Sequence, residues 1–145
     1  MKRFALIPAK SRSTRLPGKN IKELGGVPMV VRVIKNLKDS KLFDEIWVST
    51  DGDDISKICI NAGAKIHNRP NSLAEDRSTI NDVCMHWLNS LTKKPDIFCC
   101  AYATSVFLRP SDYQNAFKLL RYPYDGVMGV STYTYPPVQA MIEDG

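Results

Sequence analysis

The sequence lacks the features that would place it in a membrane or among metal-binding proteins. It contains no apolar run of the roughly 18 residues that a membrane-spanning helix needs. The apolar stretch near its amino terminus, FALIPA, is too short for a signal peptide. Its four cysteines include no CxxC pair, and its two histidines, His67 and His86, lack metal-ligand spacing. We therefore expect a cytoplasmic protein with buried free thiols and no membrane partner.

A large excess of charge of one sign is also absent. The formal net charge is +5, the aromatic residues are not interleaved with the cations, and no nucleic-acid-reading motif is present, so we expect no nucleic acid partner. The positive residues concentrate in the first forty positions, which favours a local anion site. The 145 residues, of which 43% are hydrophobic, suffice for one domain with a single core.

Short apolar segments of two kinds alternate along the chain. Strands are expected over residues 2–8, 45–50, 64–67, 96–102 and 125–131. Helices are expected over residues 28–37, from the acids at 51–54 to Gly63, from Ser78 or Thr79 to Leu91, and over 110–121. Such alternation predicts the α/β class, with a mainly parallel sheet and helices on both faces.

Four local patterns give sharper expectations. Residues 96–102, DIFCCAY, are nearly all apolar, which is typical of a strand covered on both faces. Thr79 and Asp82 have the spacing of a capping box. Asp51 precedes a glycine in an acidic run, and we expect it to cap the following helix. His86 lies one turn from Asp82, which indicates a surface ion pair.

The most distinctive segment is the basic loop, IPAKSRSTRLPGKN at residues 7–20, directly behind the first expected strand. It contains neither GxxxxGK[ST] nor GxGxxG, and its one glycine is Gly18. Its cations are Lys10, Arg12, Arg15 and Lys19. In an open α/β sheet, ligands collect beyond the carboxyl ends of the strands. Side-chain cations at such a place can neutralise a triphosphate, although a solvated surface loop is the alternative explanation.

Several blocks of sequence resemble the CMP-sugar synthetases, or cytidylyltransferases, which activate eight- and nine-carbon acidic sugars with CTP. The blocks are IPAK and STRLPGKN in the basic loop, VSTD at 48–51, NRP at 68–70 with LAED at 73–76, CCAYATSVFLRPSDY at 99–113, and YTYPPVQ at 133–139. The last two look most like the pseudaminic acid branch, whereas STRLPGK is similar to the KDO enzymes. Tyr102 stands where sialic acid enzymes commonly have Gln.

The resemblance implies a fold and a reaction. The fold is a Rossmann-like, GT-A-like nucleotidyltransferase domain over residues 1–145, expected to be the amino-terminal part of a longer family fold. The reaction transfers CMP from CTP to a nine-carbon acidic sugar such as pseudaminic acid and releases pyrophosphate. Mg²⁺ is expected with CTP, but the family's aspartate ligands are expected beyond this chain, so no metal ligand is assigned here. A homodimer is expected for a full-length protein.

The resemblance also implies roles for individual residues. Arg12 and Lys19 are the expected catalytic residues. The expected nucleotide ligands are Pro8, Ala9, Lys10, Arg12, Ser13, Arg15, Lys19, Asn20, Arg69 and Asp76. The expected sugar ligands are Tyr102, Thr104, Ser105, Phe107 and Gln139. For several of these residues a structural role is the alternative explanation. The alternatives are a turn or cap for Asn20, a surface position for Arg69, a helix start for Asp76, and a place in the core for Tyr102 and Phe107.

Two further functions remain open from the sequence. One is a truncated, non-catalytic domain that binds CTP. The other is a synthetase for a different acidic sugar, namely sialic acid, legionaminic acid or KDO.

Overall fold

The computed structural model describes residues 1–13, 16–75 and 77–132. The chain divides into two units, Met1–Gln114 and Asn115–Gly145. Within the described residues, no helix is both long enough and apolar enough to cross a bilayer. That the chain forms a single domain stays a prediction.

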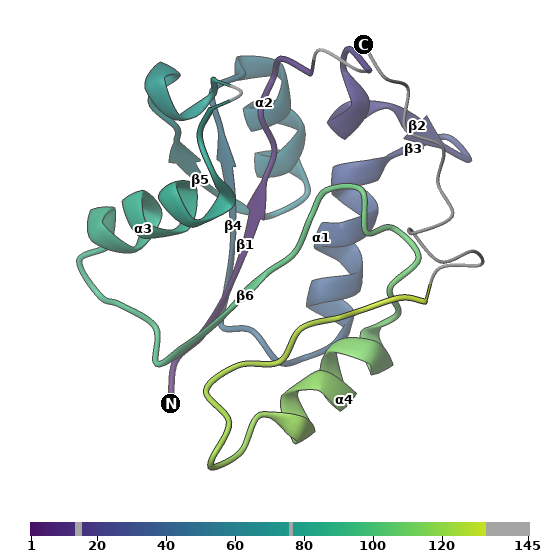
Figure 1. Ribbon diagram of the computed structural model, residues 1–145. Coiled ribbons are helices and arrows are strands. Elements are labelled where there is room, and N and C mark those ends of the chain that lie inside the picture. The colour runs from purple at the N-terminus through teal and green to yellow at the C-terminus, as the bar shows by residue number, and fades with distance from the viewer. Residues whose placement is uncertain (14–15, 76, 133–145) are drawn as a thin grey trace, which may run out of the picture. The chain divides into compact units, whose positions relative to one another are not determined.

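The first unit is built on a four-stranded parallel sheet (Figure 1). Its strands are β1 (Arg3–Pro8), β4 (Glu45–Thr50), β5 (Lys65–Asn68) and β6 (Ile97–Cys100), in the spatial order β5-β4-β1-β6. Each lies within one or two residues of an expected strand. Because all the pairings are parallel, the carboxyl ends of the four strands lie at the same edge of the sheet.

The four expected helices are also present. They are α1 (Met29–Asp39), α2 (Asp53–Asn61), α3 (Ile80–Ser90) and α4 (Pro110–Leu119), the last of which extends into the second unit. At the start of α3, the Thr79 side chain accepts a hydrogen bond from the Asp82 N–H, and the Asp82 carboxylate accepts one from the Thr79 N–H. The predicted capping box is therefore confirmed.

Three short elements between β1 and α1 were not predicted. A 3₁₀ turn, η1 (Lys19–Ile21), is followed by a hairpin of two-residue strands, β2 (Glu23–Leu24) and β3 (Val27–Pro28). The intervening Gly25 and Gly26 have φ values of 57° and 73°, and positive φ at both central residues is what a tight hairpin turn requires. Two-residue strands are too short to show an alternating pattern. A second 3₁₀ turn, η2 (Asn71–Leu73), follows β5.

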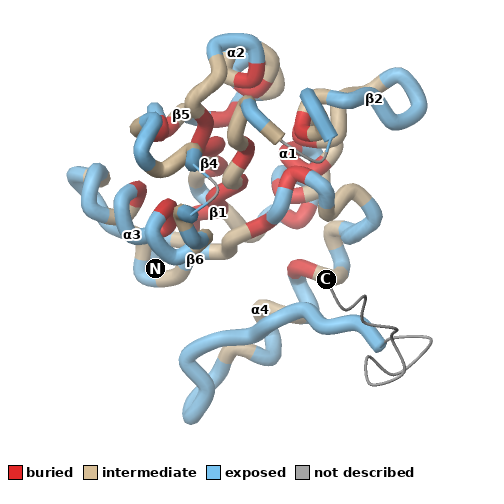
Figure 2. Tube along the Cα trace, turned by 45° about the horizontal axis from the view of Figure 1, so that its top comes forward, coloured by how far each residue is buried: buried red, intermediate tan, exposed pale blue. Residues whose placement is uncertain are grey.

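One face of the sheet is covered by α1 and α2. Val30, Val33, Ile34 and Leu37 recur at helical spacing along α1, and all four are buried against Ala5 and Ile7 of β1. Ile55 and Cys59 of α2 join the same cluster. Figure 2 shows the resulting concentration of buried positions along β1, β4 and α1.

The opposite face is covered by α3. The alternate residues of β1, Phe4 and Leu6, pack against Trp87 and Cys84 of that helix. Successive side chains of a strand point to opposite faces, so β1 serves both cores and is apolar throughout. Figure 1 shows α3 and α1 on opposite sides of β1. The prediction of helices on both faces is confirmed.

Two expectations about strands are wrong. β6 lies at the edge of the described sheet, and Phe98 on it is 38% exposed, so this strand is not covered on both faces. Residues 125–131 form neither helix nor strand, and they are exposed. Their apolar, glycine-containing pattern suits a strand, but a strand also needs a hydrogen-bonded neighbour, which a local pattern does not supply.

The four cysteines are free. Cys59 and Cys84 are buried, whereas Cys99 and Cys100 on the edge strand are half-buried. Burial raises the pKa of Cys59 to about 12 and that of Cys99 to about 11, so both stay protonated thiols at neutral pH. The expectation of buried thiols therefore holds fully only for the two cysteines on helices.

Candidate functional site

The predicted site residues follow the carboxyl ends of all four parallel strands. The basic loop follows β1, Asp51 follows β4, Arg69 follows β5, and residues 101–109 follow β6. Parallel pairing brings these four segments to one edge of the sheet, where α/β folds place their ligands. Arg15, Asp76 and Gln139 lie outside the described residues.

The basic loop is attached to the end of β4. The backbone N–H of Ala9 donates to the carbonyl of Ser49 at 2.9 Å, which continues the pairing of β1 with β4. Two residues later, the N–H and the hydroxyl of Ser11 donate to the two carboxylate oxygens of Asp51, at 2.7 and 2.6 Å. The loop therefore leaves the sheet along a defined path.

Asn20 closes the other end of the loop. The residue is only 5% exposed, and its side-chain amide donates to the carbonyl of Lys10 at 2.9 Å. Two residues before it, Gly18 has φ 67°, a left-handed conformation that glycine adopts without strain. This contact gives Asn20 a structural role in the loop, as the alternative of a turn or cap residue expected. A role for Asn20 in base recognition stays a prediction.

A pocket of about 440 Å³ opens beside the closed loop. One part of its lining comes from the basic loop and η1, and the other from the start of α2. The lining residues are Lys10, Ser11, Gly18, Asn20, Ile21, Gly52, Asp53, Asp54 and Ile55. The pocket therefore lies where the first strand-to-helix connection faces the second.

The described cations of the loop differ in exposure. Arg12 is exposed, whereas Lys10 and Lys19 are half-buried. The hydroxyl of Ser13 accepts a long hydrogen bond of 3.4 Å from the N–H of Leu16, which leaves its own hydrogen to donate elsewhere. Arg12 has the exposure that a ligand for an anion in solution requires.

Arg69 is buried against the end of β4 rather than on the surface. It is 8% exposed, and its guanidinium donates to the Ser49 hydroxyl at 3.2 Å and to the Ser49 carbonyl at 2.9 Å. Burial lowers the pKa of Arg69, and the carboxylate of Asp51 works against that shift. The alternative of a solvated surface arginine is wrong. Contact with a nucleotide stays a prediction for this residue.

Asp51 does not cap α2. The N-cap of that helix is Gly52, and the helix has no side-chain cap. Burial on its own would raise the pKa of Asp51, but the hydrogen bonds from Ser11, together with the positive charge of Arg69, outweigh burial and lower it. Asp51 is therefore an ionised group at neutral pH whose partner lies forty positions earlier in the chain.

The two histidines contact each other. Nε2 of His67 lies 2.9 Å from Nδ1 of His86, and Nδ1 of His67 lies 2.9 Å from the Ser49 hydroxyl. The expected ion pair of His86 with Asp82 is wrong, because the Asp82 carboxylate bonds to Thr79 instead. Nothing in the sequence indicates a contact between residues nineteen positions apart on a strand and a helix.

The histidine pair leads to a prediction about pH. Burial, reinforced by the charges of His86 and Arg69, lowers the pKa of His67 from 6.5 to about 4. Between these values the unfolded chain binds more protons than the folded one, so the stability present above pH ~6.5 is lost as the pH falls toward ~4. We expect His67→Asn, which keeps an amide near Ser49, to remove on the order of 2 kcal/mol of this pH dependence.

Urea unfolding of both proteins across this pH window measures the effect, because the carboxylates that also titrate there are common to both. Parallel stability profiles for the two proteins would contradict a neutral, buried His67.

The segment after β6 presents side chains to solvent. Tyr102 is 53% exposed and Phe107 is 85% exposed, so the alternative that placed them in the core is wrong. Thr104 is exposed and Ser105 is half-buried. These side chains have the exposure that a ligand role requires, and sugar binding stays a prediction for them.

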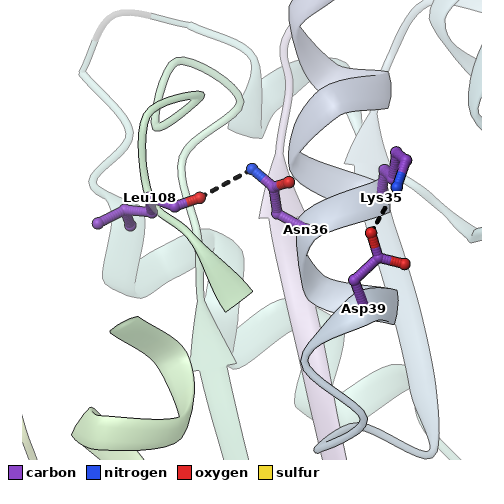
Figure 3. A network of polar contacts seen from close by, with 4 residues as sticks. All are labelled: Lys35, Asn36, Asp39 and Leu108. Atoms are coloured by element: carbon purple, nitrogen blue, oxygen red, sulfur yellow. Dashed lines mark hydrogen bonds and ion pairs between the residues drawn. The ribbon is translucent and has the colours of Figure 1, made fainter. Parts of the chain in front are cut away.

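The same segment is held by α1. The side-chain amide of Asn36 donates to the carbonyl of Leu108 at 2.8 Å (Figure 3). The neighbouring Lys35–Asp39 pair on this helix, also drawn in Figure 3, is an exposed i, i+4 ion pair, a kind that contributes little to stability. The path of residues 101–109 therefore depends on a helix that belongs to the main core.

The described residues contain no group of three or more His, Cys, Asp or Glu side chains that could hold a metal ion.

Comparison with known proteins places this geometry in a family. A sequence model of the family described as cytidylyltransferase matches residues 4–133. The N-acylneuraminate cytidylyltransferase of Oncorhynchus mykiss is 39% identical over 116 residues, which are 80% of this chain and 27% of that protein. The pseudaminic acid cytidylyltransferase of Campylobacter jejuni, serotype O:2, is 29% identical over 141 residues, 94% of this chain and 61% of that protein.

A solved structure shows the same fold. CMP:2-keto-3-deoxy-manno-octonic acid synthetase complexed with CTP has a TM-score of 0.72 at 24% identity, covering 83% of this chain and 47% of that one. The predicted α/β nucleotidyltransferase fold is thereby confirmed. The chain spans between 27% and 61% of the length of the two relatives named above. By the match over residues 4–133, and in agreement with the sheet and its loops, the chain belongs to the cytidylyltransferase family.

Proposed function

We propose that this chain carries the CTP site and part of the sugar site of a CMP-sugar synthetase that acts on a nine-carbon acidic sugar of the pseudaminic acid type. The observation that supports it most is the basic loop, which is fixed at the carboxyl end of the central strand β1 by Ser11 and Asp51 and exposes Arg12. The whole protein is proposed to be a homodimer that uses Mg²⁺ with CTP.

In the proposed reaction, the anomeric hydroxyl oxygen of the sugar forms a bond to the α-phosphorus of CTP. The bond from that phosphorus to the oxygen bridging the β-phosphate breaks, pyrophosphate leaves with the electron pair, and the proton of the hydroxyl passes to water. Negative charge grows on the phosphate oxygens during this step, so cations aimed at them stabilise the transition state. Arg12 and Lys19 are proposed to donate there, with Lys10, Arg15 and the Ser13 hydroxyl assisting.

The base is proposed to lie near the end of β1. Pro8 has no N–H, and the N–H of Ala9 is already bonded to Ser49, so these two residues can offer a base only carbonyl oxygens. A carbonyl oxygen accepts from an amino group, which cytosine has and uracil lacks. The remaining residues proposed to bind the nucleotide are Asn20, Arg69 and Asp76. This arrangement favours CTP over UTP.

The acceptor sugar is proposed to lie against the segment after β6. Tyr102, Thr104 and Ser105 offer hydroxyl groups for a carboxylate or for sugar hydroxyls, Phe107 offers an apolar surface for a deoxysugar methyl group, and Gln139 adds an amide. The pseudaminic acid cytidylyltransferase of Campylobacter jejuni, which aligns with 94% of this chain, supports this choice of sugar.

The deciding experiment incubates the protein with CTP, Mg²⁺ and one acidic sugar at a time, and follows pyrophosphate release. We expect release with pseudaminic acid, and less or none with sialic acid, legionaminic acid or KDO. CTP binding measured by calorimetry without turnover of any of the sugars would select a non-catalytic CTP-binding domain. Absence of CTP binding would overturn the proposal.

A further inference from the structure

The geometry points to Asp51 as a positioning residue that holds the basic loop in the shape that binds the triphosphate. The inference rests on the proposed function, because the triphosphate is the ligand for which the loop would be shaped. Its first support is the contact itself, in which both carboxylate oxygens of Asp51 accept from Ser11, one from the backbone N–H and one from the hydroxyl. We call this pair of contacts the Ser11 anchor.

The place of Ser11 in the loop gives the anchor its effect. Ser11 stands between Lys10 and Arg12, so fixing its backbone fixes the starting points of both cationic side chains. A flexible loop would have to lose that freedom when it binds a ligand, and pre-ordering removes this cost from the binding step.

Gly52 supplies a second, independent observation. A Cβ atom built on Gly52 would lie 2.9 Å from the Cβ of Ser11, closer than real Cβ contacts. The φ of Gly52 is −110°, which any residue can adopt, so its backbone conformation does not require glycine here. The close approach of Ser11 does. The turn after β4 is therefore shaped to receive the loop.

Charge excludes a direct role for Asp51 as a phosphate ligand. A carboxylate repels phosphate, and both oxygens of this one are already occupied by Ser11. Arg69, bonded to Ser49 below, supports the ionised form of Asp51. Asp51 thus acts on a nucleotide through the loop.

Trypsin digestion without nucleotide tests the anchor by itself. The peptide bonds after Lys10 and Arg12 flank Ser11, and mass spectrometry of the fragments reports their cleavage. We expect Asp51→Ala to raise the rate of cleavage at these bonds by about tenfold. Trypsin cuts the locally opened loop, and losing hydrogen bonds to a charged group raises the population of that open form. Gly52→Ala should also raise it, because the added methyl group displaces Ser11.

Asp44→Ala is the matched control. The Asp44 carboxylate accepts a bond from the N–H of Arg3 at 2.7 Å, the same kind of contact at the amino end of β1. We expect this variant to leave cleavage after Lys10 and Arg12 unchanged. Equal cleavage rates for Asp51→Ala and Asp44→Ala would overturn the inference.

Calorimetry with CTP then tests positioning. We expect Asp51→Ala to weaken CTP binding by about tenfold. Asp51→Asn should weaken it less, because its amide oxygen can accept from the Ser11 N–H and its amino group can donate to the Ser11 hydroxyl oxygen. In an Arg12→Ala background, Asp51→Ala should weaken CTP binding by less than about threefold. The effects of two residues are not additive when one acts through the other. Full additivity would overturn the inference. A wild-type protein that does not bind CTP would overturn the proposed function instead, while the digestion would still decide on the anchor.

Discussion

Replacing Trp87 with alanine is expected to lower the free energy of unfolding by about 3–5 kcal/mol, the range for deleting a large buried aromatic side chain. Trp87 is fully buried and is the largest side chain of the core under α3. It packs edge-on against Trp47, with ring centroids 6.4 Å apart, and against Phe98 at 5.6 Å. Its removal would leave a cavity between α3 and the sheet. Urea unfolding followed by circular dichroism measures the loss.

Trp87→Phe is the matched control. Among the described residues, no hydrogen-bond partner reaches the buried Nε1 of Trp87, and an unpaired buried donor costs about 1–3 kcal/mol. Phenylalanine removes that donor and keeps an aromatic ring, so we expect Trp87→Phe to lower the free energy of unfolding by less than about 2 kcal/mol. Equal losses for the two variants would show that the ring does not fill this core.

The double substitution Arg12→Ala, Lys19→Ala is expected to weaken CTP binding at least ~100-fold, because each charge-assisted hydrogen bond contributes about 1.5–3 kcal/mol. Arg12 is exposed and Lys19 is half-buried in the basic loop, so the free energy of unfolding should change by less than about 0.5 kcal/mol. Titration calorimetry with CTP, and urea unfolding of the same variant, measure the two quantities.

The control for this prediction removes the same charge elsewhere. Lys93 and Lys94 are exposed and precede β6 at the amino edge of the sheet. Lys93→Ala, Lys94→Ala lowers the net charge by the same two units, and we expect CTP binding to change less than about twofold, as screening predicts for distant charges. If both double variants bound CTP alike, the loop would attract the nucleotide only through net charge.

Periodic segments could be predicted from the sequence because their burial follows from local spacing. The stripe of Val30, Val33, Ile34 and Leu37 fixes which side of α1 faces the sheet, whatever the neighbours are. The position of a strand within its sheet is not local. Phe98 sits in an apolar run, yet it is 38% exposed on a strand that has no described neighbour on one side.

The candidate site could be predicted to a similar extent. Its location followed from the basic loop and from the parallel strand order. The partners of individual polar groups did not follow, because they come from distant parts of the chain. Asp51 precedes an acidic helix start and suggested a cap, but its partner Ser11 belongs to another loop. Arg69 suggested a nucleotide ligand or a surface arginine, but it is buried and its guanidinium donates to the hydroxyl and the carbonyl of Ser49 on β4.

The hydrogen bond from Asn36 to Leu108 involves a main-chain oxygen, and every amino acid supplies the same oxygen. This contact therefore restrains residues 101–109 whichever exposed side chains they carry, while the buried Ala101 and Ala103 hold the segment to the core. On the proposed function, mutation can replace Tyr102, Thr104 or Phe107 and redirect the enzyme to another acidic sugar while the phosphate-gripping end of the site stays intact. In such a fold, the specificity for the acceptor sugar can change while the binding of the nucleotide stays the same.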